Sequence, residues 1–121
     1  MDWQSIFDHL KGRGFDVYAL GAHQGLCKSP YLVLRNNGST LNGSLTAQEY
    51  EILLYCPLKH YRAFEGYIAD VKTTMNELFP VLRLIDDQQP HYLDDDVQGY
   101  MTSLIYRLYT PHTINHITRK D

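Results

Sequence analysis

The chain has 121 residues, of which 44% are apolar and 21% are charged, and its formal net charge is −3. These values are typical of a single globular domain and exclude an intrinsically disordered chain. They also show no basic surplus of the kind with which nucleic-acid-binding proteins neutralise phosphates.

The N-terminal segment, residues 2–14, is predicted to form a short amphipathic helix. Its apolar residues Trp3, Ile6 and Leu10 recur at helical spacing and would share one face. Asp2 is suited to the N-cap position, and two glycines near the end of the segment are suited to stop the helix.

Three strands are expected after this helix. The first two, at residues 15–20 and 31–36, are joined by a turn-rich connection. Residues 36–47, with the sequence NNGSTLNGSLTA, predict a glycine-containing hairpin loop of about a dozen residues. Loops of that length in a compact domain are usually functional or mobile. The third strand is expected at residues 48–57 and ends at a proline.

The clearest helix is predicted over residues 60–79, where apolar residues are spaced alternately three and four apart. These residues are Tyr61, Phe64, Ile68, Val71, Met75 and Leu78. A fourth strand is expected at residues 81–86 and a loop at residues 87–97. A long fifth strand is expected at residues 99–110, and residues 110–121 form a C-terminal tail without a firm assignment.

The element order is therefore α-β-β-β-α-β-β within one domain spanning residues 1–121. It predicts an α+β two-layer sandwich, in which two helices cover one face of an about five-stranded, mostly antiparallel (mixed) sheet. The third and fifth strands carry apolar residues on both faces, so the uncovered face would expose apolar side chains. Because such surfaces usually mark interfaces, we expect an oligomer.

Three consecutive carboxylates, Asp94, Asp95 and Asp96, precede the fifth strand and raise the question of a metal or catalytic site. Their spacing does not match a calcium-binding EF-hand loop. Adjacent residues of an extended chain also point to opposite faces, so all three cannot converge on one ion. We interpret them as a solvated acidic approach to the strand or as the rim of an interface.

Other metal and catalytic patterns are incomplete. His112 and His116 have the spacing of a zinc-protease helix, but the glutamate that such a site needs after the first histidine is absent. His23 and Cys27 form a further candidate pair for a soft metal. The sequence has no G-x-S-x-G motif and no glycine-rich phosphate loop with a following lysine. We therefore expect no enzymatic activity and no cofactor.

Two alternatives remain open at this point. A nucleic-acid-binding α+β module would stack single-stranded bases on its tyrosine-rich strands, with Arg35, Arg83 and Arg107 nearby. A small metal-binding protein would use the histidines near the C-terminus together with the aspartates. The N-terminus has no signal-peptide pattern, and no apolar run is long enough to span a bilayer, so neither secretion nor a membrane partner is expected.

Five segments follow one another in a characteristic order: DVYAL, SPYLVLRNNG, YEILLYCPL, YRAFEGYIADVKTTMNELFPVLRL and DDDVQGYMTSLIYRLY. The series contains a strand ending in proline, a helix ending near LFP, and an acidic stretch before an aromatic strand. This order, over residues 16–110, resembles that of the tail terminator (tail completion, neck) proteins of long-tailed bacteriophages.

The resemblance implies a structural protein that forms a homo-hexameric ring on the head-proximal end of the tail tube. In that family the ring stops tube polymerisation and joins the tube to the head–tail connector (stopper) protein. The expected partners are therefore further copies of the chain, the tail tube protein, the connector and, in a contractile tail, the sheath protein. Phage DNA would pass through the lumen without specific binding, and the location would be the virion neck, after assembly in the host cytoplasm.

The family also ties long loops between strands to ring and tube contacts. Through the resemblance, an interaction role is expected for eight residues of the polar loop: Asn36, Asn37, Gly38, Ser39, Thr40, Leu41, Asn42 and Gly43. The three aspartates are expected at the rim of such a contact. Tyr100 and Tyr106 of the fifth strand are expected to take part in assembly.

Overall fold

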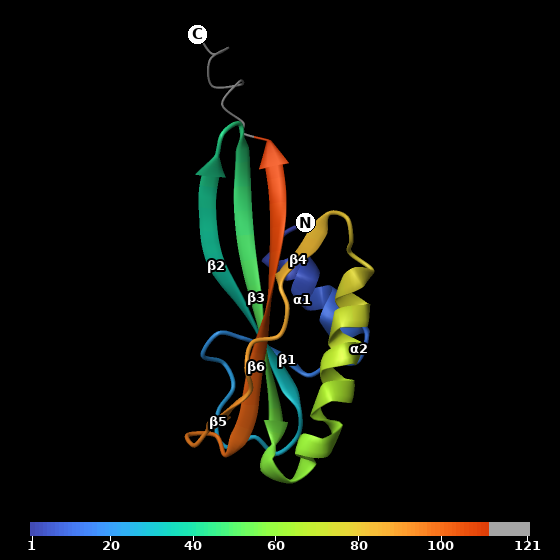
Figure 1. The fold of residues 1–121 in the computed structure, drawn as a ribbon, viewed down its shortest axis with the longest axis vertical. Coiled ribbons are helices and arrows are strands. Elements are labelled where there is room, and N and C mark those ends of the chain that lie inside the picture. Colours follow the sequence, from blue (N-terminus) through green and yellow to red (C-terminus); the bar gives the residue numbers. More distant parts are fainter. Residues whose placement is uncertain (112–121) are drawn as a thin grey trace.

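The structure, a computed structural model, describes residues 1–111 as a twisted sheet with two helices on one face (Figure 1). The helices are α1 (Trp3–Gly12) and α2 (Phe64–Asn76), with the 3-10 helix η1 (Leu58–Ala63) leading directly into α2. The strands are β1 (Val17–Ala19), β2 (Tyr31–Asn42), β3 (Leu45–Pro57), β4 (Leu82–Asp86), β5 (Tyr92–Asp94) and β6 (Gly99–Pro111). The predicted α+β sandwich is confirmed.

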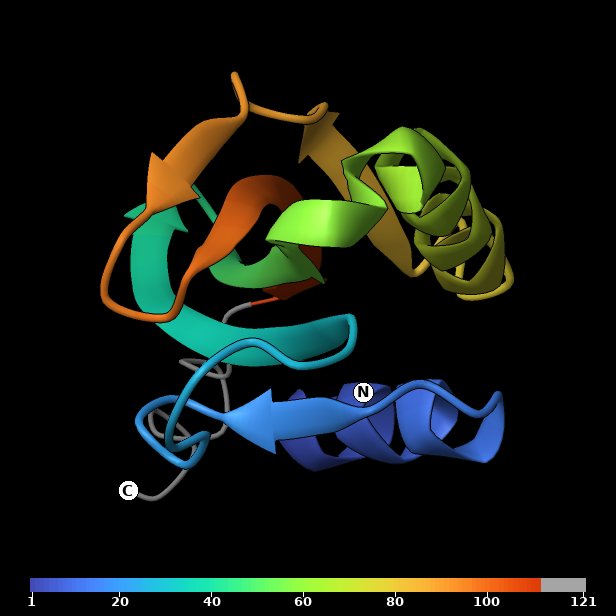
Figure 2. The ribbon, with the colours of Figure 1, turned by 90° about the horizontal axis from the view of Figure 1, so that it is seen from below.

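The strand order in the sheet is β1-β2-β3-β6-β4, and β5 pairs with the first residues of β6. Only β1 and β2 are parallel, so the sheet is mixed and mostly antiparallel, as predicted. It has six strands because β5 forms within the segment 87–97 that was expected to be a loop. Seen from below, α1 lies next to β1 at one edge, and α2 lies next to β4 toward the other edge (Figure 2).

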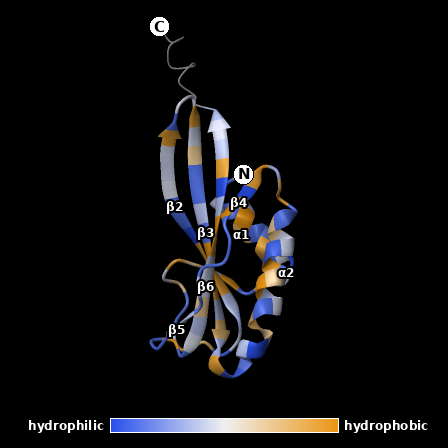
Figure 3. Ribbon diagram, in the orientation of Figure 1, coloured by the Kyte–Doolittle hydropathy of each residue, from blue (hydrophilic) through white to orange (hydrophobic). Residues whose placement is uncertain are grey.

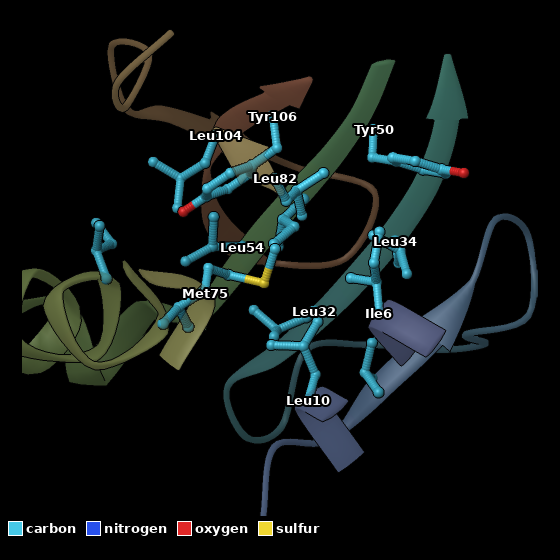
Figure 4. Close-up of a cluster of buried hydrophobic side chains, with 14 of the residues drawn as sticks. Ile6, Leu10, Leu32, Leu34, Tyr50, Leu54, Met75, Leu82, Leu104 and Tyr106 are labelled. Carbon is cyan, nitrogen blue, oxygen red and sulfur yellow. The ribbon is translucent and has the colours of Figure 1, made fainter. Parts of the chain in front are cut away.

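The core lies between the two helices and the facing side of the sheet. Ile6 and Leu10 of α1 and Met75 of α2 point toward side chains from β2, β3, β4 and β6 (Figure 4). These strand residues include Leu32, Leu34, Tyr50, Leu54, Leu82, Leu104 and Tyr106. Alternate residues of β2, β3 and β6 contribute to this core, as expected when one face of a sheet packs on helices.

The first helix agrees with its prediction. The Ser5 backbone N–H donates to Asp2 Oδ1 at 2.9 Å, which confirms the predicted N-cap. Ile6 and Leu10 are fully buried, and the Trp3 indole N–H donates to the Leu34 carbonyl oxygen at 2.9 Å. Helix α1 is therefore anchored to the edge of β2 by both apolar contact and a hydrogen bond.

The second helix is shorter than predicted. The apolar stripe extends over residues 60–79, but the chain is α-helical only in Phe64–Asn76. Residues 58–63 form the 3-10 helix η1 instead, and within it His60 has φ −112° and ψ 19°, outside the helical region. Four stripe residues of α2, Phe64, Ile68, Val71 and Met75, are buried, whereas Tyr61 in η1 is exposed.

The prediction of a long polar loop at residues 36–47 is wrong, since most of these residues belong to β2 and β3. Their ladder continues to the pair Asn42 and Leu45, which leaves a two-residue turn of Gly43 and Ser44. Gly43 has φ 64° at the first turn position, as in type II′ hairpins. The hairpin was thus predicted in the correct place, but its strands are far longer than expected.

The sequence has no apolar run long enough to span a bilayer, and the helices of the structure can be compared with this expectation. Neither helix described for residues 1–111 has the length and apolarity needed to cross a lipid bilayer.

Candidate interaction surface

Three strands extend well beyond the helix layer (Figure 1). This part consists of residues 39–42 of β2, 45–48 of β3 and 108–111 of β6, and we call it the three-stranded projection. Its strands remain in register to the tip, where Asn42 pairs with Leu45 and Leu45 pairs with Pro111. The predicted interaction residues Asn36 to Gly43 therefore lie in an extended strand and a tight turn.

The projection has no hydrophobic core of its own. Of its side chains only Ala47 and Leu108 are buried, and Leu41 is 74% exposed. The chain carries no charged residue between Arg35 and Glu49. Figure 3 accordingly shows mixed hydropathy along the projection, in contrast to the hydrophobic positions deeper in the sheet.

A β-bulge sets the base of the projection. Asn37 and Gly38 of β2 face the single residue Glu49 of β3. Asn36 Oδ1 accepts hydrogen bonds from the Gly38 backbone N–H at 2.8 Å and from Gln48 Nε2 at 2.7 Å. Gly38 has φ 92°, a conformation in which side chains are strained, so glycine is needed here.

A polar cluster on the side of the sheet away from the helices supports the bulge. Asn37 Nδ2 donates to Glu49 Oε2 at 3.0 Å and to Glu51 Oε1 at 3.1 Å, and Arg107 Nη2 contacts Glu49 Oε1 at 3.1 Å. The hydrogen bonds from Asn37 and then Arg107 lower the pKa of Glu49 below its usual value. This cluster links β2, β3 and β6, and so fixes the direction in which the projection extends.

The second face of the sheet is only partly exposed, contrary to expectation. Residues 20–30 fold over it, and Cys27 packs with Tyr31 and Val33 in a separate buried cluster. The Cys27 backbone N–H donates to the Val97 carbonyl oxygen at 2.7 Å. The His23 ring stacks on Tyr31 at 3.7 Å between centroids. Part of the apolar surface that predicted an oligomer is therefore covered within the chain itself.

The two predicted tyrosines of β6 lie on the face that packs on the helices. Tyr106 is 3% exposed in the core, so it offers no surface to a partner in this structure and its predicted interaction role is not supported. Tyr100 is half-buried against Tyr61, with the ring centroids 4.3 Å apart. Met101, Ser103, Ile105, Arg107 and Tyr109 have the opposite orientation. The sequence did not indicate that these five residues face away from the helices, because β6 carries apolar residues at both odd- and even-numbered positions.

The three aspartates occupy the connection between β5 and β6. Asp94 ends β5, and Asp95 and Asp96 begin a four-residue turn that leads to Gly99. Asp94 Oδ1 accepts a hydrogen bond from the Asp96 backbone N–H at 3.1 Å, while Asp95 and Asp96 are exposed. Asp95 and Asp96 thus lie in a turn that leads into a strand, as predicted, whereas Asp94 belongs to the unpredicted strand β5.

Replacing Asp94, Asp95 and Asp96 together with asparagine is expected to change the free energy of unfolding by less than about 0.5 kcal/mol. Asparagine at position 94 keeps an acceptor oxygen for the turn. The control Asp94→Ala removes that acceptor and is expected to lower stability by about 1 kcal/mol. Urea denaturation of both variants measures the difference, and a loss of several kcal/mol in the triple variant contradicts the assignment of solvated carboxylates.

The metal candidates are not brought together where the structure describes them. Across residues 1–111, no group of three His, Cys, Asp or Glu side chains is placed to hold a metal ion. His112 and His116 lie outside the described residues. Cys27 is buried and His23 is stacked on Tyr31, so this pair has the contacts of packing residues.

One cavity contains chemically reactive residue types. It has a volume of about 470 Å³ and is lined by Cys56, His60, Asp70 and Tyr67, among others. Burial raises the pKa of the Cys56 thiol, which donates a hydrogen bond to the Pro57 carbonyl oxygen. A thiol in this state is not activated as a nucleophile. This cavity has therefore no arrangement that indicates a reaction.

Comparison with protein-family models and with curated proteins gives no match for this chain.

Proposed function

We propose that this chain is a structural phage neck protein without catalytic activity. Copies of it form a ring, hexameric by resemblance, that caps the head-proximal end of the tail tube, stops its polymerisation and joins it to the head connector. The observation that favours this proposal most is the three-stranded projection, because it is built in a way that an isolated monomer does not need.

A short sheet without a hydrophobic layer gains little stability from burial, and exposed strand edges promote association with other chains. Natural edge strands are commonly protected by charged side chains, yet the projection has none between Arg35 and Glu49. Its exposed Leu41 adds an apolar contact at the tip. A neutral surface of this kind suits a protein partner, and we assign it to the tail tube protein.

The charge of the chain is compatible with a conduit for DNA. A net charge of −3 gives no long-range attraction for phosphates, so DNA would pass through a ring of such chains without being retained. A virion location, at the neck, is part of the same proposal.

The alternative of a nucleic-acid-binding module receives less support. Base stacking needs neighbouring accessible aromatic rings, but Tyr31, Tyr50 and Tyr106 are buried. The exposed strand tyrosines Tyr92 and Tyr109 lie on different strands, β5 and β6. Arg107 is engaged with Glu49 at 3.1 Å. The metal-binding alternative lacks a ligand cluster among residues 1–111.

The variant Leu41→Asp tests the proposal at the tip of the projection. Because Leu41 is 74% exposed, we expect its stability to change by less than about 0.5 kcal/mol, while tube capping is lost. Purified protein is added to polymerising phage tail tube protein, and tube lengths are measured by negative-stain electron microscopy. The wild-type protein should shorten the tubes and the variant should not.

Leu20→Asp is the matched control, since Leu20 is 65% exposed but lies in the segment that covers the second face. This variant should cap tubes like the wild-type protein. Wild-type protein that leaves tube length unchanged contradicts the proposed function. Full capping by Leu41→Asp contradicts the role of the projection.

A further inference from the structure

The sheet has an open edge along β2. Strand β1 pairs only with Leu32, Val33 and Leu34 of β2, and the Leu34 carbonyl oxygen also accepts the Trp3 indole N–H. Beyond this point, residues 35–42 pair with β3 on one side, and no strand among residues 1–111 occupies the other side. The Gly38 backbone N–H and carbonyl oxygen bond to the side chains of Asn36 and Gln48, and the other outward-pointing backbone groups of this stretch meet no strand among residues 1–111.

The opposite edge of the sheet is β4. It pairs with β6 on its inner side only, and all of its residues except Leu82 are exposed. Leu84 and Ile85 are apolar residues on this exposed edge, and Val81 precedes them. An exposed apolar edge strand is a template for strand addition.

The strand registers place the two open edges at the same level of the sheet. One row across the four strands β2, β3, β6 and β4 contains Arg35, Glu51, Ile105 and Asp86. The row above contains Asn36, Tyr50, Tyr106 and Leu84, and a third contains Ser39, Gln48, Leu108 and Leu82. The β4 edge is therefore level with the lower half of the open β2 edge, directly beyond the end of β1.

Strand direction makes these edges suitable for each other. Strand β2 is antiparallel to β3, β3 to β6, and β6 to β4, so β2 and β4 run in opposite directions. In a ring whose axis follows the strands, all copies have the same orientation. The β4 of one copy then meets the β2 of the next copy antiparallel, without a shift along the axis. A contact between two different surfaces is the kind that closes into a ring.

The side chains at the two ends of the first row have opposite charges. Arg35 and Asp86 are both exposed, and neither forms a salt bridge within residues 1–111. When the two edges meet, Arg35 of one copy lies beside Asp86 of the next. Each edge also contains a bulge, near Gly38 and at Ile85, and bulges and charges at edges disfavour unselective pairing.

From these observations we infer that a second copy of this chain adds its β4 to the open edge of β2, antiparallel, with Asp86 next to Arg35. The inference rests on the proposed ring and names the contact that closes it. It also explains why β1 is short, since a longer β1 would occupy the edge that the neighbouring copy uses.

Cysteine crosslinking tests this contact directly. Residues opposite each other on antiparallel strands have Cβ atoms about 4.5–5.5 Å apart, within reach of a short bismaleimide. At high protein concentration, the double variant Arg35→Cys/Asp86→Cys should give a ladder of covalent oligomers on a denaturing gel. The two single variants, the control Arg35→Cys/Lys59→Cys and the wild-type protein should not, since Cys27 and Cys56 are buried. A double variant without a ladder, or a crosslinked dimer from Arg35→Cys alone, overturns the inference.

Charge reversal provides a second measurement that does not depend on a crosslinker. Arg35→Asp and Asp86→Arg should each weaken self-association by about two- to fivefold per contact, and the combined variant should restore it. Sedimentation velocity measures the oligomer size. Rings that cap tubes but do not respond to the exchange contradict this contact and leave the proposed function intact. A restored oligomer whose wild-type form does not cap tubes supports the contact and contradicts the function.

Discussion

Replacing Phe64 with alanine is expected to lower the free energy of unfolding by about 3–5 kcal/mol. Phe64 is 1% exposed at the first residue of α2, where it packs between the helix and the sheet, and its ring lies 5.0 Å from that of His91. The alanine variant loses this burial and leaves a cavity that the rigid sheet cannot close. Because small domains are stable by only about 5–15 kcal/mol, the loss should be visible as a much lower urea midpoint.

Tyr61→Ala is the matched control for this prediction. The sequence places Tyr61 and Phe64 on the same apolar stripe, but Tyr61 is 42% exposed in η1. It contacts Tyr100 and hydrogen-bonds His91 at the surface, so its removal should lower stability by no more than about 1.5 kcal/mol. Equal losses for the two variants contradict the division between η1 and α2.

The apolar stripe shows both the strength and the limit of sequence periodicity. It identified the face of α2 that is buried, because Ile68, Val71 and Met75 recur at a spacing that only a helix brings together. It did not identify where the α-helix begins, because the apolar stripe continues from Tyr61 to Phe64 although residues 58–63 form a 3-10 helix. Helix boundaries depend on local backbone conformation, which side-chain hydropathy does not encode.

The strands illustrate a different limit. Residues 38–44 have no apolar alternation, so their composition indicates a loop. The extended conformation of residues 39–42 comes from ladder hydrogen bonds to β3, and the third strand β6 reinforces the hairpin from the other side. Both ladders depend on residues distant in the sequence. The hairpin turn was therefore predicted in the correct segment, through the turn signal at Gly43, but the strands on either side of it were predicted as loop.

The prediction of which β6 side chains are available to a partner failed for a related reason. Tyr106 and Arg107 are adjacent and point to opposite faces of the sheet. The sequence does not indicate whether the even- or the odd-numbered residues pack on the helices, since Leu104 and Ile105 are both apolar. The structure decides this through the register, which places Tyr106 opposite Tyr50 in the core. The cover formed by residues 20–30 also had no sequence signal, because Cys27 is an isolated residue in a turn-rich connection.

Replacing Gly99 with alanine is expected to lower the free energy of unfolding by about 1–3 kcal/mol. A Cβ atom at position 99 would lie 2.9 Å from the Cys56 carbonyl oxygen and 3.0 Å from Cys27 Cβ. Both distances are shorter than van der Waals contact allows, and the closer atom belongs to the backbone of β3. Either the ladder between β3 and β6 or the packing of Cys27 on the second face must shift.

The control is Gly66→Ala on α2, where a Cβ atom would meet nothing within 4 Å. There the same substitution should raise stability by up to about 1 kcal/mol, because alanine favours the helix more than glycine does. Urea denaturation of both variants should thus give changes of opposite sign. A thiol reagent locates the disturbance. In the wild-type protein burial raises the pKa of the Cys27 thiol to about 11, so this thiol should react faster in Gly99→Ala than in the wild-type protein. An unchanged stability together with an unreactive Cys27 would contradict the close contacts of position 99 with Cys56 and Cys27.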